Sequence, residues 1–133
     1  MDSKKAVEIA RQYLSALERR VLSETKQNVA PASSFIYPGD RRPASVDEIL
    51  ASSRARYKGV FKSIQRTDVL ANEDGSCTVY IIGFLHGTWA DGVDFKGIRF
   101  IDRFEIADDG IRLHEVWNDA ADARARLATQ KAS

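Results

Sequence analysis

The chain has 133 residues, of which 44% are hydrophobic, so it can form one domain with a sizeable core, and two domains are not expected. Twenty lysines and arginines against nineteen aspartates and glutamates leave a formal charge of +1, which argues against a nucleic-acid partner or an anionic membrane surface. The single cysteine, Cys77, excludes an internal disulfide and a thiolate metal cluster and is typical of a reducing, cytoplasmic location. No stretch approaches the roughly 18 apolar residues that span a bilayer.

Three helices are predicted in the first half of the chain. Apolar residues recur every three or four positions from residue 4 to 20, which indicates an amphipathic helix. A shorter helix is predicted over residues 24–29, with Ser23 as its cap and Pro31 as its stop signal. Residues 45–48 form a capping box, in which Ser45 and Glu48 cap each other's amides, and begin a helix that reaches about Tyr57.

The second half is typical of a sheet. A short strand at 34–37 precedes a loop rich in proline and glycine, in which Arg41 and Arg42 are expected to be solvated. After residue 57 the period changes to two, and Asp-Gly-type turns separate long strands at 60–70, 78–89, 98–106 and 111–118. Strands of this length require a sheet that bends, and Gly83 and Gly87 are the candidate bending points. Residues 120–133 are expected to form a weak helix or a frayed tail.

This order of elements resembles the nuclear transport factor 2-like superfamily, particularly its SnoaL-like polyketide cyclase and ketosteroid isomerase branches. The resemblance is carried by IARQYLSAL at 9–17, GIRFIDRFEI at 97–106, DGI at 109–111 and VWND at 116–119. It implies one SnoaL-like α+β domain over residues 1–133, with its core at 4–120. Three amino-terminal helices would pack on a strongly curved, mostly antiparallel sheet that forms a cone around an internal pocket, the cystatin-like roll.

Asp102 and Tyr13 are the first candidate catalytic residues. Asp102 lies between Phe100 and Phe104 on the apolar face of its strand. Burial there would raise its pKa, so it could stay protonated and donate a hydrogen bond, or act as a general acid or base. Alternatively, it bonds a buried hydroxyl or arginine and serves packing. Tyr13 lies in the middle of the apolar stripe of the first helix. By the resemblance, both fall where ketosteroid isomerases place their oxyanion donors, whereas Tyr37 occupies the position of the isomerase's general base.

His86 and Asp119 are the candidates for proton transfer. His86 has a suitable reference pKa, although a lone histidine on an apolar strand face is more often a packed residue. Asp119 is similar in position to an acidic residue of SnoaL-like cyclases, or else is a solvated turn carboxylate. The resemblance places Trp117 and Asp119 on the pocket face. Neither histidine lies in a metal-ligand motif, so we expect no metal and no cofactor.

Aromatic side chains are expected to line the pocket and bind a flat, apolar ligand, although they would also suit an ordinary core. The candidates are Tyr37, Tyr57, Phe84, Trp89, Phe100 and Trp117.

Two functions remain open from the sequence. The first is a cofactor-independent isomerase, cyclase or dehydratase that does acid-base chemistry beside a carbonyl of a ring-bearing substrate. The second is a non-catalytic ligand-binding or dimerisation module, because the isomerase's base is missing. The resemblance also implies a homodimer in which the outer faces of two sheets pack together near Arg99, Ile101, Arg103, Val116 and Asn118.

Overall fold

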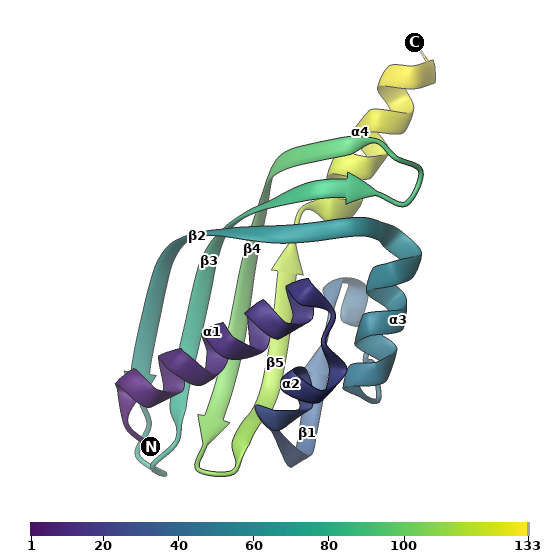
Figure 1. Ribbon diagram of the computed structural model, residues 1–133. Helices are drawn as coiled ribbons and strands as arrows, with labels where there is room; N and C mark the ends of the chain where they lie inside the picture. The colour runs from purple at the N-terminus through teal and green to yellow at the C-terminus, as the bar shows by residue number, and fades with distance from the viewer. Residues whose placement is uncertain (133) are drawn as a thin grey trace.

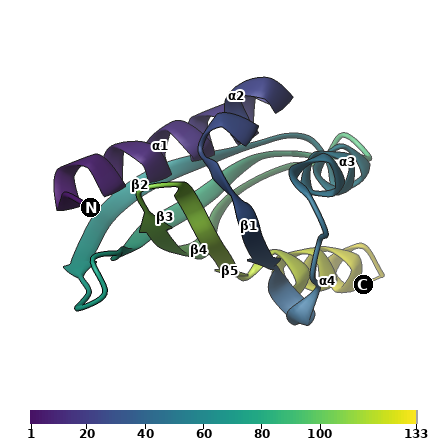
Figure 2. The same ribbon diagram turned by 90° about the horizontal axis from the view of Figure 1, so that it is seen from below.

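The computed structural model describes residues 1–132 and the side chains of residues 1–130. The helices are α1 (Ser3–Arg19), α2 (Leu22–Gln27), α3 (Val46–Arg56) and α4 (Ala120–Ala132), with a 3-10 turn, η1 (Pro38–Asp40). The strands are β1 (Val29–Ile36), β2 (Tyr57–Ala71), β3 (Cys77–Trp89), β4 (Asp94–Ala107) and β5 (Gly110–Asn118). Three amino-terminal helices pack on one curved, mostly antiparallel sheet (Figures 1 and 2), which confirms the predicted fold class.

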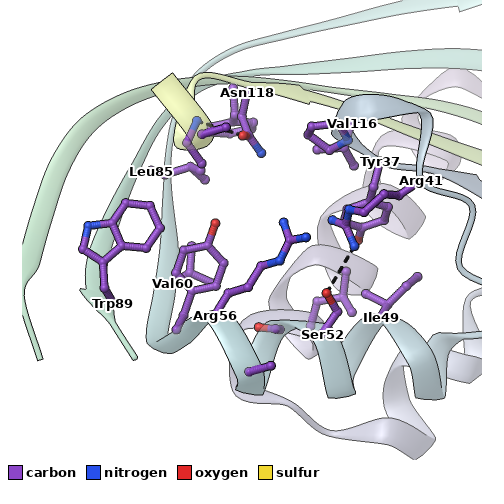
Figure 3. A pocket seen from close by; sticks show the side chains of 18 of the residues that line it. Tyr37, Arg41, Ile49, Ser52, Arg56, Val60, Leu85, Trp89, Val116 and Asn118 are labelled. Carbon is purple, nitrogen blue, oxygen red and sulfur yellow. Dashed lines mark hydrogen bonds between the residues drawn. The ribbon is translucent and has the colours of Figure 1, made fainter. Parts of the chain in front are cut away.

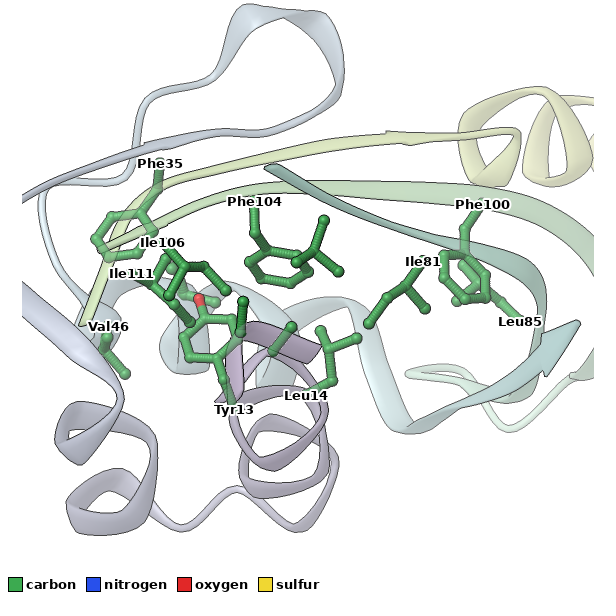
Figure 4. Packing of buried hydrophobic residues seen from close by; sticks show 14 of the residues in the cluster. Tyr13, Leu14, Phe35, Val46, Ile81, Leu85, Phe100, Phe104, Ile106 and Ile111 are labelled. Atoms are coloured by element: carbon green, nitrogen blue, oxygen red, sulfur yellow. The ribbon is translucent and has the colours of Figure 1, made fainter. Parts of the chain in front are cut away.

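Helix α1 follows the amphipathic pattern of its sequence. The Asp2 carboxylate accepts a hydrogen bond from the Lys4 amide at 3.0 Å, and Arg20 ends the helix in the left-handed conformation. Figure 4 shows Tyr13 and Leu14 directed at the buried side chains of the sheet. The alanines on the same face let the helix backbone approach the sheet closely, so the Tyr13 ring reaches deep into the core.

The segment after α1 differs from its prediction. α2 begins at Leu22 with Val21 as its N-cap, so Ser23 lies inside the helix and does not cap it. β1 begins at Val29 and contains Pro31, where the sequence predicts a helix end. Proline fits there because β1 is an edge strand that pairs only with β5, and no second neighbour requires the missing N–H.

Helix α3 begins where the capping box predicts. The Ser45 hydroxyl accepts a hydrogen bond from the Glu48 amide at 3.3 Å, and the Glu48 carboxylate accepts one from the Ala44 amide at 2.7 Å. The helix passes into β2 without a loop. The side chains at this junction, Arg56 and Tyr57, therefore lie between the helical layer and the sheet.

The sheet has the order β1-β5-β4-β3-β2 and is antiparallel except for the pair β1 and β5. The β2–β3 ladder shifts register beside Gly83, and the β3–β4 ladder shifts beside Gly87. A Cβ on Gly83 would lie 2.0 Å from the Ser63 carbonyl oxygen, and one on Gly87 would lie 2.2 Å from the Gly59 carbonyl oxygen. Only glycine allows these backbone approaches, and the far ends of β2, β3 and β4 turn sharply there (Figure 1).

The core fills the space between α1 and the sheet. The described part of α4 is helical rather than frayed, and it packs Ala120, Ala123 and Leu127 against the core. None of the helices in the described residues combines the length and apolarity needed to cross a bilayer.

We predict that Gly83→Ala lowers the free energy of unfolding by about 1–3 kcal/mol, because the added methyl group meets rigid backbone. Urea denaturation measures this change. Gly59→Ala is the matched control, since its methyl group would meet only the ring of Phe61, which is 44% exposed and can move. Equal losses in the two variants would show that the bend does not depend on Gly83.

Candidate functional site

A cavity of about 740 Å³ lies between the helices and the bent part of the sheet. α1, the η1 loop and α3 supply one side, and β2 to β5 with the start of α4 supply the other. Figure 3 shows Trp89 and Leu85 across an open centre from Tyr37 and Arg41. The volume falls within the ~300–1,000 Å³ of ordinary ligand sites, so a ring-bearing molecule fits.

Four aromatic side chains form part of the cavity wall. Tyr57 and Trp89 stack with their ring centres 5.2 Å apart and their planes inclined by 19°. Phe100 is buried in β4, and Tyr37 follows the end of β1. Such a wall favours contact with the face of a flat apolar molecule.

Lys62 brings a positive charge to the cavity from β2. Its Nζ lies 2.7 Å from Oδ2 of Asp102 and 5.2 Å from the centre of the Phe100 ring. Asp102 is fully buried and does not line the cavity, whereas the Lys62 side chain is 18% exposed. Among the described residues no hydrogen-bond donor other than Lys62 reaches Oδ2. The ammonium is thus the member of the pair that a ligand can touch.

Behind the ion pair lies a buried chain of hydrogen bonds. Tyr13 Oη is 3.0 Å from Nδ1 of His114, and Nε2 of His114 is 3.3 Å from Oδ1 of Asp102. Burial, followed by the neighbouring Tyr37 and Asp102, raises the pKa of Tyr13, so its phenol keeps its proton and donates to Nδ1. The imidazole proton is then on Nε2 and is donated to Asp102.

The charge states of His114 and Asp102 in this hydrogen-bond network correct the prediction that Asp102 is protonated. Burial lowers the pKa of His114 in spite of the hydrogen bond and charge of Asp102, so His114 is neutral at pH 7. Burial by itself would raise the pKa of Asp102, but Lys62 and His114 together hold it below its usual range. Asp102 is therefore an ionised acceptor, and the prediction of a protonated donor is wrong because the sequence did not reveal its cationic neighbour.

A carboxylate and a phenol also face the cavity. Glu18, near the end of α1, accepts a hydrogen bond from the Lys62 backbone amide at 2.6 Å, which holds its carboxylate beside β2. Burial raises the pKa of Tyr57 against the opposing charges of Arg56 and Arg41, so its phenol remains a donor. The cavity thus combines a carboxylate, an anchored ammonium and a phenol hydroxyl, which are groups used in acid-base chemistry.

Known proteins resemble this chain in structure rather than in sequence. No protein-family model matches it, and no curated protein sequence matches it significantly. An NTF2-like protein of unknown function from Burkholderia pseudomallei superposes with a TM-score of 0.72 over 92% of this chain and 95% of that one, at 14% identity. The chain has the nuclear transport factor 2-like (NTF2-like) fold. The predicted fold is thereby confirmed.

Two further solved structures are similar to this chain over most of its length. A proposed polyketide cyclase from Xanthomonas campestris pv. campestris has a TM-score of 0.65 over 86% of this chain and 90% of that one, at 16% identity. TerC, co-crystallised with polyporic acid, has a TM-score of 0.72 over 90% of this chain and 95% of that one, at 14% identity. At such identities the likeness shows the fold alone.

Within the NTF2-like cone, four of the predicted ligand-binding residues line the cavity: Tyr37, Tyr57, Trp89 and Phe100. Tyr13 and Asp102 do belong to one network, but His114 joins them and neither lines the cavity. They cannot therefore act as a pair of donors that a ligand touches directly.

The predicted pocket face of β5 is wrong. Val116 and Asn118 line the cavity, so Trp117, which is 50% exposed, points to the outer side of the sheet. Val116 and Asn118 therefore face the cavity and do not lie on the outer sheet face that was predicted to form the dimer interface. Asp119, just beyond β5, accepts a hydrogen bond from Arg99 Nε at 2.7 Å and borders a smaller cavity of about 550 Å³ beside α4.

The face assigned to His86 and Phe84 is also reversed. Leu85 of β3 is buried and lines the cavity, whereas Phe84 is 41% exposed on the outer face. His86, exposed on the same outer face, stacks on Phe61 of β2 with ring centres 5.7 Å apart. Side chains along β3 do alternate as predicted, but alternation does not tell which side of a strand meets the helices.

Four charged residues line the cavity that the sequence did not predict there: Lys62, Glu18, Arg41 and Arg56. Lys62 had a recognisable signal, since it is a charged residue between two apolar positions of one strand face, as Asp102 is. The prediction that Arg41 and Arg42 are both solvated is wrong for Arg41, which lines the cavity, whereas Arg42 is exposed. No local pattern separates the two arginines, because the path of the η1 loop decides which one turns inward.

We predict that mild acid destabilises the protein through His114. Because its pKa is lowered in the folded state, the unfolded chain binds a proton below about pH 6.5 that the folded state does not bind. The stabilisation is complete above that pH and is lost as the pH falls towards the folded-state pKa, by up to about 1.4 kcal/mol per pH unit. Asp102, whose pKa is also lowered, adds a further loss only below about pH 4.

Urea unfolding between pH 8 and pH 5 measures this effect. His114→Gln keeps a donor and an acceptor but cannot titrate, so its stability should depend less on pH than that of the wild type. His86→Gln is the control, because the chain has only these two histidines and His86 is exposed. The explanation fails if His114→Gln and the wild type have the same pH dependence.

Proposed function

We propose that the chain binds a small ring-bearing molecule in the cavity and performs cofactor-independent acid-base chemistry beside one of its carbonyl groups. One observation carries this proposal: the Lys62 ammonium, anchored by buried Asp102, lies in the same cavity as the Glu18 carboxylate. A cation stabilises the negative charge that develops on a carbonyl oxygen, and a carboxylate accepts the proton that is removed.

In the proposed reaction Glu18 removes a proton from the carbon next to the carbonyl group. The electrons of the C–H bond move to the carbonyl oxygen, and the resulting enolate oxygen faces Lys62. Where a carbon–carbon double bond is conjugated with the enolate, return of the proton to the far carbon of that double bond shifts the bond and completes an isomerisation. Attack of the enolate carbon on a second carbonyl, whose oxygen then takes the proton from Glu18, completes a cyclisation; either outcome regenerates the Glu18 carboxylate.

The remaining members of the network act as positioning residues in this proposal. Asp102 holds the Lys62 ammonium at 2.7 Å, and His114 with Tyr13 fixes the orientation of Asp102. A site group held by such a buried shell needs little rearrangement when charge develops. His86 and Asp119 lie outside the cavity and have no role in this reaction.

The fold neighbours support a ring-bearing ligand. They include a proposed polyketide cyclase and a protein crystallised with polyporic acid. The alternative function, ligand binding without catalysis, is favoured by Tyr37 at the position where the resemblance predicts a general base. Turnover distinguishes the two functions.

We predict that the protein accelerates exchange of the α-protons of 2-tetralone, a two-ring ketone, with deuterated water. Proton NMR follows the loss of the α-proton signals without requiring the natural substrate. Glu18→Gln should reduce the rate by about 10²–10⁴, since a positioned base contributes that much, while the affinity for the ketone changes little.

The matched control is Glu8→Gln, which alters an exposed carboxylate on the same helix. Its exchange rate should equal that of the wild type. Binding of 2-tetralone without any accelerated exchange would instead support the non-catalytic alternative. Equal loss in Glu8→Gln and Glu18→Gln would exclude Glu18 as the base.

We also propose that the protein is located in the cytoplasm, where the free thiol of Cys77 would remain reduced. We further propose that it forms a homodimer. An outer apolar patch crosses four strands and consists of Phe61, Phe84, Ile101 and Trp117, which are 38–50% exposed. Strand pairing places Ile101 beside Trp117 and Phe61 beside His86, which lies two residues from Phe84 on the same strand face. Exposed apolar side chains gathered on one sheet face favour burial against a second copy.

We predict that sedimentation gives twice the chain mass for the wild type and the chain mass for the double variant Phe84→Glu/Trp117→Glu. Two carboxylates within the patch would have to be desolvated in a dimer. Leu22→Glu is the control, because Leu22 is 38% exposed but lies on α2, and it should remain dimeric. A monomeric wild type, or a dimeric double variant, would contradict this assembly.

A further inference from the structure

Two guanidinium groups enter the cavity wall without a carboxylate partner in the described residues. Arg41, on the η1 loop, donates from Nη1 to the Ser52 hydroxyl at 3.2 Å and lies 5.5 Å above the Tyr37 ring. Arg56, the last residue of α3, has no side-chain hydrogen bond to any described residue. Figure 3 shows both guanidinium groups directed at the open centre of the cavity.

The other charged side chains of the cavity are already engaged. Lys62 pairs with Asp102, and Arg124 of α4 pairs with Asp91. Glu18 is held by the Lys62 backbone amide. The excess positive charge of the cavity therefore lies on the side formed by the η1 loop and α3, which carry Arg41 and Arg56.

The proximity of these two positive charges is electrostatically unfavourable. Burial first, and the charge of Arg56 second, lower the pKa of Arg41, so the two cations repel each other. Tyr37 and Tyr57 do not cancel this repulsion, because burial raises the pKa of both phenols and they stay neutral. A negative group placed between two guanidinium groups would remove the repulsion and could accept hydrogen bonds from both forks.

We propose that Arg41 and Arg56 form a subsite for a carboxylate group, so that the cavity selects ring-bearing ligands that carry a carboxylate. This rests on the proposed ligand-binding function and specifies its substrate class. The carboxylate lies between the two guanidinium groups, and the ring system extends from it across the open centre towards Trp89 (Figure 3). The subsite orients the ligand, because its charged end can lie only on the side of the two arginines.

Calorimetric titration with 2-naphthoate and 2-naphthamide tests the subsite, since the two probes have the same rings and nearly the same shape but differ in charge. The wild type should bind 2-naphthoate at least about tenfold more tightly, as expected for a charge-assisted bidentate contact. Arg41→Met and Arg56→Met should each remove most of this preference and leave the affinity for 2-naphthamide unchanged. Methionine keeps an unbranched apolar stem in each position.

Two neighbouring arginines provide matched controls. Arg42, which pairs with Asp40 at 3.0 Å, and Arg54, exposed on α3, do not line the cavity. Arg42→Met and Arg54→Met should keep the full preference for 2-naphthoate. Equal loss in these controls would show that only the overall charge matters, and would overturn the subsite.

A ligand-free measurement gives a second, independent test. Because Arg41 and Arg56 repel each other, Arg56→Met should unfold at the same temperature as the wild type or at a higher one, and a clear decrease would contradict the inference. Equal binding of the two probes by the wild type overturns the carboxylate subsite alone. If neither probe binds, the proposed ligand-binding function fails together with it.

Discussion

The ion pair between Lys62 and Asp102 connects the packed core of this protein to its cavity. A carboxylate with no exposed surface is costly to bury unless a charge and hydrogen bonds compensate the lost water, and both are present here. The neutral His114 ring supplies the hydrogen bond, and Tyr13 determines which imidazole nitrogen carries the proton. The first helix, the second strand and the last two strands are thus linked by one polar chain, and its reachable end is the Lys62 ammonium.

The bend of the sheet is the second constraint, and it creates the space into which that ammonium opens. Long strands that stayed flat would pack against α1 along their whole length and leave no cavity. Glycine at positions 83 and 87 lets neighbouring backbones approach where a side chain would collide, so the strand ends turn away and leave a space that α3 and the η1 loop enclose. The alternation of side chains then separates an apolar cavity wall from an outer face that carries Phe84 and Trp117.

The charges of the cavity are unevenly distributed, and this shapes the proposed function. The region around Lys62, Asp102 and Glu18 contains compensating charges that can move or stabilise a proton. The region around Arg41 and Arg56 is left positive. Neighbouring like charges that lower the stability of the folded protein are typical of functional sites, where binding is favoured at the cost of stability. The structure therefore separates a region suited to chemistry from a region suited to orientation.

The sequence by itself determined the fold class, because helix periodicity, the capping box at Ser45 and the change to a period of two are local signals. It also selected the apolar face of β4 and the glycines of the bend. It misplaced β1, since only its edge position makes Pro31 acceptable in a strand. Tertiary structure decided three further features. It determined which face of β3 and β5 meets the helices and which arginine of the Arg41-Arg42 pair turns inward. It also brought Lys62 to Asp102, whose charge it neutralises. Those outcomes depend on contacts between segments far apart in the chain, which no local pattern records.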